Sequence, residues 1–329
     1  MKNRSYLYIA AIFACIIIIY ACKKVTPGYL SPNVFYQQNP IQIPKGRTFL
    51  STPFNPDGST QPYTVAVLHY YNSAGDIVDS LFAKKYPVTV FTRYIDPRVD
   101  TSFAQITSAL KTDYLPPVSF LPASGQLSAN AGALNLPGGT YKFDLKISNV
   151  AGTRIYPKIG AFTLVDTTNF DAVPAIGSTS ESFAQVGNES ISGGSGKAPK
   201  ITITRIADTP NIVTVKYVDK NGTPWNPQAG EVIPAPYTGP PFLQCFQQYT
   251  SSYYYTSTSS VFRYPLTPFP LNSLGNGFNI YQRIVGKYVA ADGKVAGQWH
   301  MRLRFPLRIF VPGSYLVVEQ AVDATRIQP

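Results

Sequence analysis

The sequence predicts an all-β protein built from tandem β-sandwich domains, and three observations support this. Glycine and proline number 24 and 29 among 329 residues, which favours many turns and few long helices. Charged residues make up 14% of the chain, well below the roughly 25% of an average soluble protein, while aromatic residues make up 13%. Short apolar-polar alternations recur between turn signals, as strands require. We therefore expect neither a disordered chain nor a helical bundle, and the length suggests two domains of about 150 residues each.

The first residues have the order of a secretory signal. Lys2 and Arg4 precede an apolar run over residues 7–19, and a small residue, Ala21, stands directly before Cys22. The run is shorter than the roughly 20 apolar residues of a comfortable membrane span. We predict a signal peptide over residues 1–21.

Residues 19–22, with the sequence Ile-Tyr-Ala-Cys, resemble the lipobox of bacterial lipoproteins. That resemblance implies that Cys22 is lipidated and becomes the new N-terminus, so the membrane is a partner through the lipid. Residues 22–30 then form a short tether. The alternative is an ordinary signal peptide in which the cysteine occurs by chance.

Cysteine and histidine are too few for a structural metal site. Once Cys15 in the signal and the lipidated Cys22 are set aside, Cys245 is alone in the folded body, so no intramolecular disulfide forms there. With His69 and His300 as the two histidines, we expect no metal site and no cofactor. The formal net charge of +11 comes from scattered basic residues, and we therefore do not expect nucleic acid as a partner.

We assign residues 31–168 to a first domain with an immunoglobulin-like sandwich. In residues 64–71, strict alternation would place side chains on two faces, with Val65, Val67 and His69 on one and Ala66, Leu68 and Tyr70 on the other. A turn at residues 72–76 would make a hairpin. Residues 141–147 alternate between apolar and polar side chains and predict a strand with one buried face.

Helical spacing occurs at residues 101–111, where Asp100 is positioned to cap a short helix that contains Phe103, Ile106 and Leu110.

Two short motifs repeat near the ends of the two domains. Residues 137–141 and residues 312–315 each contain Pro-Gly followed by a tyrosine that opens a strand. A turn that leads into such a tyrosine resembles the late strands of immunoglobulin-like sandwiches, where the ring packs at a corner.

The second domain is assigned to residues 169–329. It opens with a predicted hairpin of residues 201–206 and 212–218, followed by a turn at residues 219–222. Near its end, residues 298–310 alternate until Pro306, with Trp299, Met301, Leu303 and Phe305 on one face and His300, Arg302 and Arg304 on the other. Residues 166–199 are rich in serine and glycine, and either a linker or a long loop fits them.

No motif points to catalysis, and we predict no catalytic residue. Residues 192–197 resemble a phosphate-binding loop but have Ile191 and Ala198 where glycine and a hydroxyl residue are needed. No serine near His69 has the context of a nucleophile. A glycosidase needs two carboxylates facing one sugar, and the sequence indicates no such pair.

The segment of residues 242–264 is the most distinctive part of the chain, because it contains eight aromatic residues, eight serines or threonines and no acid. Three consecutive tyrosines in a strand must place at least one ring opposite the other two. Exposed rings beside hydroxyl groups suit the faces of neutral sugars. The candidate ligand-binding residues are therefore Trp225, Tyr253, Tyr254, Tyr255 and Trp299. Alternatively, the segment is rich in tyrosine and threonine because these residues favour strands.

Together, the lipobox at Cys22, the tether, residues 138–149 with the sequence GGTYKFDLKISN and the tyrosine-rich second domain resemble accessory lipoproteins of polysaccharide-utilisation loci. The resemblance implies a lipid-anchored protein of the outer membrane, exposed at the cell surface, that binds polysaccharide without catalysis and works with a TonB-dependent transporter. Lys23 and Lys24 depart from the acidic residues that often follow the lipidated cysteine in surface-exported members, so a periplasm-facing position is an open alternative. The competing class is a structural or adhesive envelope protein whose tyrosine-rich domain is a protein interface.

Overall fold

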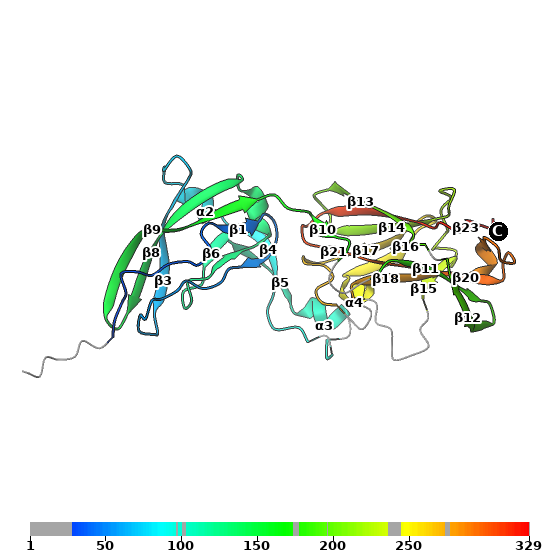
Figure 1. Ribbon diagram of the computed structural model, residues 1–329, viewed down its shortest axis with the longest axis horizontal. Helices are drawn as coiled ribbons and strands as arrows, with labels where there is room; N and C mark the ends of the chain where they lie inside the picture. The colour runs from blue at the N-terminus through cyan, green and yellow to red at the C-terminus, as the bar shows by residue number, and fades with distance from the viewer. Residues whose placement is uncertain are drawn as a thin grey trace, which may run out of the picture.

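The computed structural model describes residues 28–96, 98–100, 103–173, 178–195, 197–235, 245–273 and 277–328. The strands form two successive sandwiches, which appear in Figure 1 as two lobes along the long axis. The protein is all-β, so the predicted fold class is confirmed. The predicted signal peptide and Cys22 lie outside the described residues. Within the described part of the chain, none of the helices combines the length and the apolar character that crossing a membrane requires.

The first sandwich packs two sheets around one core. The larger sheet has, in order, β1 (Ile41–Pro44), β9 (Gly152–Val165), β8 (Gly139–Asn149) and β3 (Thr64–Tyr71). The smaller sheet has β2 (Phe49–Leu50), β7 (Leu127–Ala129) and β6 (Val118–Phe120). The connections contain α2 (Asp79–Ala83), a hairpin of β4 (Tyr86–Phe91) and β5 (Leu110–Leu115), α3 (Phe103–Ser108) and the 3₁₀ turn η1 (Ala131–Asn135).

Strand β8 confirms the predicted alternation, because Tyr141, Phe143, Leu145 and Ile147 are all buried. Asp144 is on the opposite face and is nevertheless 7% exposed. Its carboxylate accepts hydrogen bonds from the Tyr71 hydroxyl at 2.7 Å and from the Lys158 backbone N–H at 2.6 Å, which compensate for its burial.

The two corner tyrosines make the same contact in the two sandwiches. The Tyr141 hydroxyl donates to the Pro137 carbonyl at 3.0 Å, and the Tyr315 hydroxyl donates to the Val311 carbonyl at 2.7 Å. In both cases the acceptor lies four residues upstream. The repeated motif thus corresponds to a repeated structural device, the tyrosine corner of immunoglobulin-like sandwiches.

The strict alternation predicted for residues 64–71 is wrong beyond Val67. The pairing of β3 with β8 shifts between Val67 and His69, so Leu68 is an extra residue in the strand. A bulge of this kind reverses the faces of all later side chains. Val65 and Tyr70 are therefore both buried, whereas His69 is exposed. The turn at residues 72–76 forms as predicted, and Ile77 beyond it makes one antiparallel bridge with Tyr71 before the chain enters α2.

The predicted helix over residues 101–111 is shorter in the structure. The helix ends at Ser108, because Leu110 already starts β5 and pairs with Phe91 of β4. Ile106 is buried in the core of the second sandwich, and α3 contacts α4 (Cys245–Tyr249), as Figure 1 also shows. A segment of the first half of the chain thus packs against the second sandwich.

The second sandwich has two five-stranded sheets. One contains, in order, β12 (Asn188–Gly194), β11 (Ser180–Gln185), β20 (Trp299–Pro306), β18 (Asn279–Ile284) and β15 (Val232–Pro234). The other contains β13 (Lys200–Ala207), β22 (Ser314–Gln320), β14 (Ile212–Val218), β17 (Ser260–Arg263) and β16 (Ser252–Tyr255). Short pairs are formed by β10 (Phe170–Asp171) with β21 (Arg308–Ile309) and by β19 (Val289–Ala291) with β23 (Ala324–Arg326), and η2 (Gly286–Tyr288) is a 3₁₀ turn.

The predicted hairpin between residues 201–206 and 212–218 is wrong. Strand β22 lies between β13 and β14, antiparallel to the first and parallel to the second. Strand β22 uses both of its backbone edges for pairing, and its Tyr315 and Val317 side chains are fully buried in the core. Pairing with a strand more than a hundred residues away therefore replaces the local pairing.

The serine- and glycine-rich residues 166–199 are part of the second sandwich rather than a free linker. They form β11 and β12, and β11 pairs with β20 over its whole length. Phe183 and Ala184 of β11 lie in the core.

Candidate functional site

The predicted tyrosine cluster lies on β16, at one edge of the second sandwich. Strand β16 pairs with β17, and no other strand of the described residues pairs with it. Tyr253 is 49% exposed and Tyr254 is 45% exposed, while Tyr255 is half-buried. The edge of the sheet thus presents aromatic rings to solvent in adjacent positions.

The rings divide between two faces, as alternation requires. Tyr253 and Tyr255 share one face with ring centroids 6.0 Å apart, and Tyr253 also lies 6.3 Å from the buried Phe262. Tyr254 is in register with Val261 on the other face. Burial raises the pKa of the Tyr255 hydroxyl, and the neighbouring Tyr253 raises it further. Tyr253 and Tyr255 thus pack against the aromatic core, which fixes the position of their rings at the edge of the sheet.

Trp225 is not a surface platform, and this part of the prediction is wrong. The side chain is 0% exposed and belongs to the core between the two sheets. Its indole N–H donates to the Tyr288 carbonyl at 3.1 Å, and its backbone N–H donates to the Tyr217 carbonyl. The loop after β14 folds inward because burial of the large aromatic ring stabilises the fold more than its exposure to water would.

Trp299 lies at the start of β20, on the sheet opposite the one that contains β16, and is half-buried. The Lys294 ammonium group sits 4.2 Å from its ring centroid, so a cation covers one face of the indole. The structure therefore brings Tyr253, Tyr254 and Tyr255 together but does not place Trp299 on their strand or sheet.

Beside Trp299 the predicted row of basic side chains is present. Arg283 and Arg302 are paired across β18 and β20, and both bind Glu189, with 2.6 Å from Arg283 Nη1 to Glu189 Oε1. Partial burial acts to raise the pKa of Glu189, but the Arg302 hydrogen bond and the charge of Arg283 lower it overall. Burial and the nearby Arg283 lower the pKa of His300, whose Nδ1 accepts from the Gly286 backbone N–H at 2.9 Å. These contacts make the row a structural network.

Two of the three buried glutamates of the second sandwich make hydrogen bonds within the fold, and the third lies unpaired among the described residues of the core. Glu181 accepts from the backbone N–H groups of Val322 and Asp323, and its burial outweighs these bonds and raises its pKa. Glu231 binds Arg326 through both oxygens. Glu319 is 0% exposed, and among the described residues neither of its oxygens has a hydrogen-bond partner.

We expect Glu319 to make the stability of the protein depend on pH. Burial, with a smaller effect of Glu181, raises the pKa of Glu319 well above its ordinary value of 4.5. As far as this residue is concerned, the fold therefore has its full stability below pH 4.5, where Glu319 is protonated. Part of that stability is lost as the pH rises through the folded-state pKa and the buried carboxyl ionises. We expect Glu319→Gln, which stays neutral, to melt close to the wild type at about pH 4 and roughly 2–6 °C above it at about pH 9. Thermal unfolding at both pH values tests this, and an equal difference at the two would contradict it.

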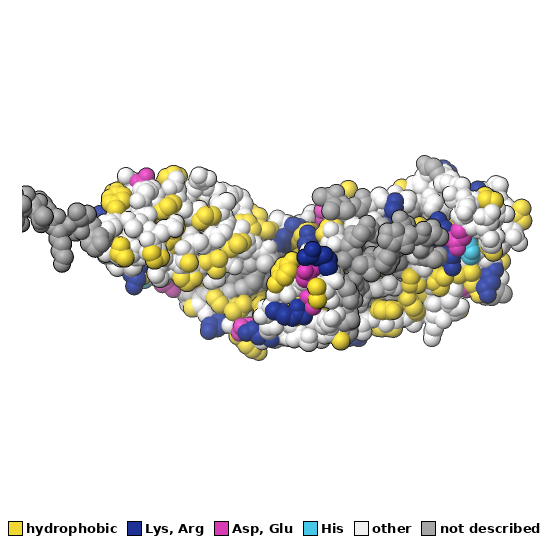
Figure 2. Space-filling view, turned by 90° about the horizontal axis from the view of Figure 1, so that it is seen from below, with side chains coloured by type: hydrophobic (Ala, Val, Ile, Leu, Met, Phe, Trp, Pro, Cys, Tyr) yellow, Lys and Arg dark blue, Asp and Glu magenta, His cyan; other side chains and the backbone are white. Residues whose placement is uncertain are grey.

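A cavity that no sequence motif predicts lies between the two sandwiches. It has a volume of about 380 Å³ and is lined by Val88, Val90 and Phe91 of β4 on one side and by Leu266 and Leu271 on the other. In Figure 2, charged side chains of both signs gather near the junction of the lobes, whereas hydrophobic side chains on the first lobe are interspersed with others.

A second unpredicted cavity, of about 460 Å³, lies in the first sandwich and is lined by Tyr70, Asp79 and Phe120, among others. Neither cavity contains two carboxylates, so neither has the acid pair of a glycosidase.

No family model and no curated protein matches the sequence. Among solved structures, a SusE-like surface-located polysaccharide-binding protein from the heparin utilisation locus of Bacteroides thetaiotaomicron is similar to the chain. The match covers 88% of this chain and 53% of that one, with 7% sequence identity and a TM-score of 0.24. This chain thus spans about half the length of that protein.

Proposed function

We propose that this protein binds glycan without catalysis, through the aromatic edge formed by Tyr253, Tyr254 and Tyr255. The observation that carries the proposal is the exposure of two adjacent tyrosines, at 49% and 45%, on an edge strand. Exposed rings of this kind stack on the CH faces of sugars. The hydroxyl groups of neighbouring serines and tyrosines donate hydrogen bonds to the sugar hydroxyls and accept hydrogen bonds from them. The contact is shallow and open, which suits a long polymer better than a small molecule.

The sequence segment that contains β16 is free of acidic residues, which favours a neutral or acidic glycan over a cationic one. No aspartate or glutamate occurs between Val232 and Ala291 in the sequence. The neighbouring Arg263, at the end of β17, is exposed and pairs in register with Ser252. Trp299 is kept as a separate, weaker candidate, because Lys294 must move before a sugar can stack on the covered face.

The test is native-gel retardation of the full chain by a panel of neutral and acidic polysaccharides. We expect Tyr253→Ala/Tyr254→Ala to lower glycan affinity by roughly tenfold or more, since each stacked ring contributes about 1 kcal/mol. Tyr114→Ala, which removes a tyrosine that is 64% exposed on the first sandwich, is the matched control and should change nothing. Retardation that survives in the double variant, or its absence in the wild type, would overturn the proposal.

A second candidate is a protein interface at the same edge. It is favoured by the position of β16, because an edge strand presents backbone donors and acceptors to which a partner strand can add. A stoichiometric protein that co-purifies after mild detergent extraction, together with no glycan affinity, would support this function. The two candidates share residues and differ in the ligand.

We further propose that Cys22 carries a lipid that anchors the protein to the outer membrane, facing the cell surface, with the first sandwich as a spacer and a TonB-dependent transporter as partner. The support is the order of the N-terminal residues. Expressed with its signal sequence, Cys22→Ala should move the protein from the membrane fraction to the soluble fraction. Membrane retention of this variant would argue against the lipid anchor.

A further inference from the structure

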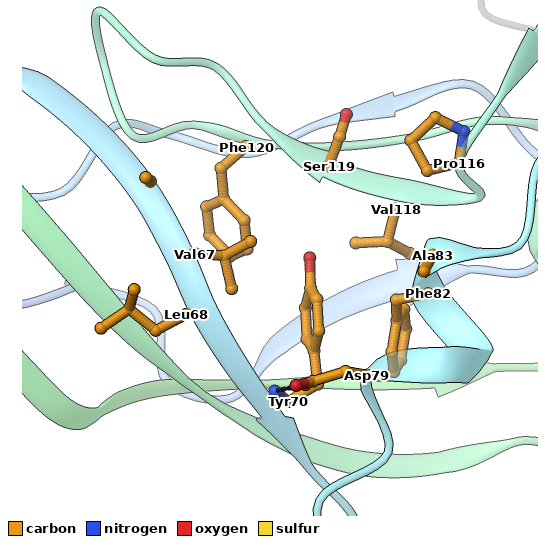
Figure 3. Close-up of a pocket in the computed structure, with 11 residues that line it drawn as sticks. Val67, Leu68, Tyr70, Asp79, Phe82, Ala83, Pro116, Val118, Ser119 and Phe120 are labelled. Carbon is orange, nitrogen blue, oxygen red and sulfur yellow. Dashed lines mark hydrogen bonds between the residues drawn. The ribbon is translucent and has the colours of Figure 1, made fainter.

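The cavity of the first sandwich opens at one edge, between β3 of the larger sheet and β6 of the smaller one (Figure 3). Both are edge strands of their sheets, and α2 supplies part of the wall. The volume of about 460 Å³ is within the usual range of about 300–1,000 Å³ for small-molecule sites. Most of the wall is apolar, with Val67, Leu68, Phe82, Val118 and Phe120. A gap of this size at the sandwich edge is large enough for a ligand.

Tyr70 directs its hydroxyl into this cavity (Figure 3). The residue is 6% exposed, and Figure 3 shows its hydroxyl directed into the space between Val67, Val118 and Phe120. Within the described residues this hydroxyl has no hydrogen-bond partner, although the backbone N–H of Tyr70 donates to Asp79 Oδ1 at 2.7 Å. Burial raises the pKa of Tyr70, so the hydroxyl stays protonated and can donate. The hydroxyl faces the cavity rather than the packed core (Figure 3), so it is available to a ligand.

The bulge in β3 is what directs Tyr70 inward. Val65 points to the core, so an unbroken strand would turn position 70 outward. The extra residue, Leu68, reverses the alternation and brings Tyr70 into the cavity. Bulges of this kind are enriched beside binding and active sites, where they redirect a side chain.

The surrounding rings favour an aromatic ligand. Tyr70 stacks on Phe82 with centroids 4.2 Å apart and an interplanar angle of 25°, and Phe120 lies 6.4 Å from Tyr70. Aromatic walls of this kind favour a further ring in offset or edge contact. Asp79, which pairs with His69 at 2.9 Å, contributes a carboxylate to the lining and disfavours an anion.

We propose that this cavity binds a neutral aryl group that carries one oxygen acceptor, which takes the hydrogen bond of the Tyr70 hydroxyl. The site is separate from β16 and does not depend on the glycan proposal. The first sandwich, proposed above as a spacer, would then also recognise an aromatic substituent or a small aromatic molecule.

The test compares acetophenone, which has a carbonyl acceptor, with ethylbenzene, which has nearly the same shape and none. Ligand-observed NMR titration of the full chain gives both affinities. We expect Tyr70→Phe to weaken acetophenone binding by roughly threefold to tenfold and to leave ethylbenzene binding unchanged, because one hydrogen bond is lost. Tyr114→Phe, on an exposed strand, is the matched control and should change neither affinity.

A second variant tests the position of the site. Val67 lines the cavity and is only partly buried, and Figure 3 shows its side chain directed into the space beside Tyr70, so Val67→Phe should fill that space and abolish binding of both probes. Absence of acetophenone binding to the wild type would overturn the proposal. Equal effects of Tyr70→Phe on the two probes, or full binding by Val67→Phe, would do so as well.

Discussion

Replacing Glu231 with alanine is expected to destabilise the second sandwich by about 3–5 kcal/mol, because the change leaves the charge of Arg326 buried without its partner. Glu231 is 1% exposed, and its two oxygens accept from Arg326 Nε at 2.8 Å and Nη2 at 2.6 Å. One of these oxygens also accepts from the Asn226 backbone N–H at 2.9 Å. The pair therefore connects the loop before β15 to β23 near the end of the chain.

Chemical denaturation of single and double variants measures this coupling. Glu231→Leu/Arg326→Leu should be less destabilised than Glu231→Ala alone, since both charges are then removed together. Asp292→Asn is the control, because its pair with Lys220 is largely exposed and should contribute about 1 kcal/mol or less. If Glu231→Ala and Asp292→Asn cost the same, the buried pair is not a major support of the fold.

The sequence predicts local features of the fold well where alternation and turn chemistry act over a few residues. The buried face of β8 follows from its period of two, and the alternation of Met301, Leu303 and Phe305 in β20 does so too. The corner contact of Tyr141 follows from a motif of five residues. In each case neighbours in the sequence supply the decisive interactions.

Features that depend on contacts between residues far apart in the chain could not be predicted from the sequence. Strand β22 pairs with both β13 and β14 and so lies between them, and nothing in residues 201–218 indicates that insertion. The bulge at Leu68 adds one residue whose pairing with β8 depends on a strand about 75 positions away. The cavity beside Tyr70 depends in turn on both sheets and α2, so no single motif could have predicted it.

For the candidate site, the sequence predicts the tyrosine cluster but not the exposure of each aromatic ring. The three consecutive tyrosines require rings on both faces of β16, and the structure has this arrangement. Whether a tryptophan in a loop faces solvent depends on the surface available for it to cover. The Trp225 ring lies in the core between the two sheets, and its indole N–H donates to the Tyr288 carbonyl.

The contrast between the two tryptophans leads to the second large effect. Trp225→Ala is expected to cost about 3–5 kcal/mol, because it removes the largest fully buried side chain and opens a cavity between the sheets. For a domain of this size that corresponds to a fall in melting temperature of roughly 6–20 °C. Trp299→Ala should cost much less, because Trp299 is half-buried and packs at the start of β20 under Lys294.

Calorimetry of the two variants, with glycan retardation measured below both melting temperatures, separates a structural role from a binding role. If Trp225 acts only in the core, Trp225→Ala binds glycan normally while folded and loses binding only when it unfolds. Loss of binding by a folded Trp225→Ala, with full binding by the variant that lacks Tyr253 and Tyr254, would mean that the loop after β14 opens to expose the indole. The glycan contact would then belong to that loop and not to the edge of the sheet.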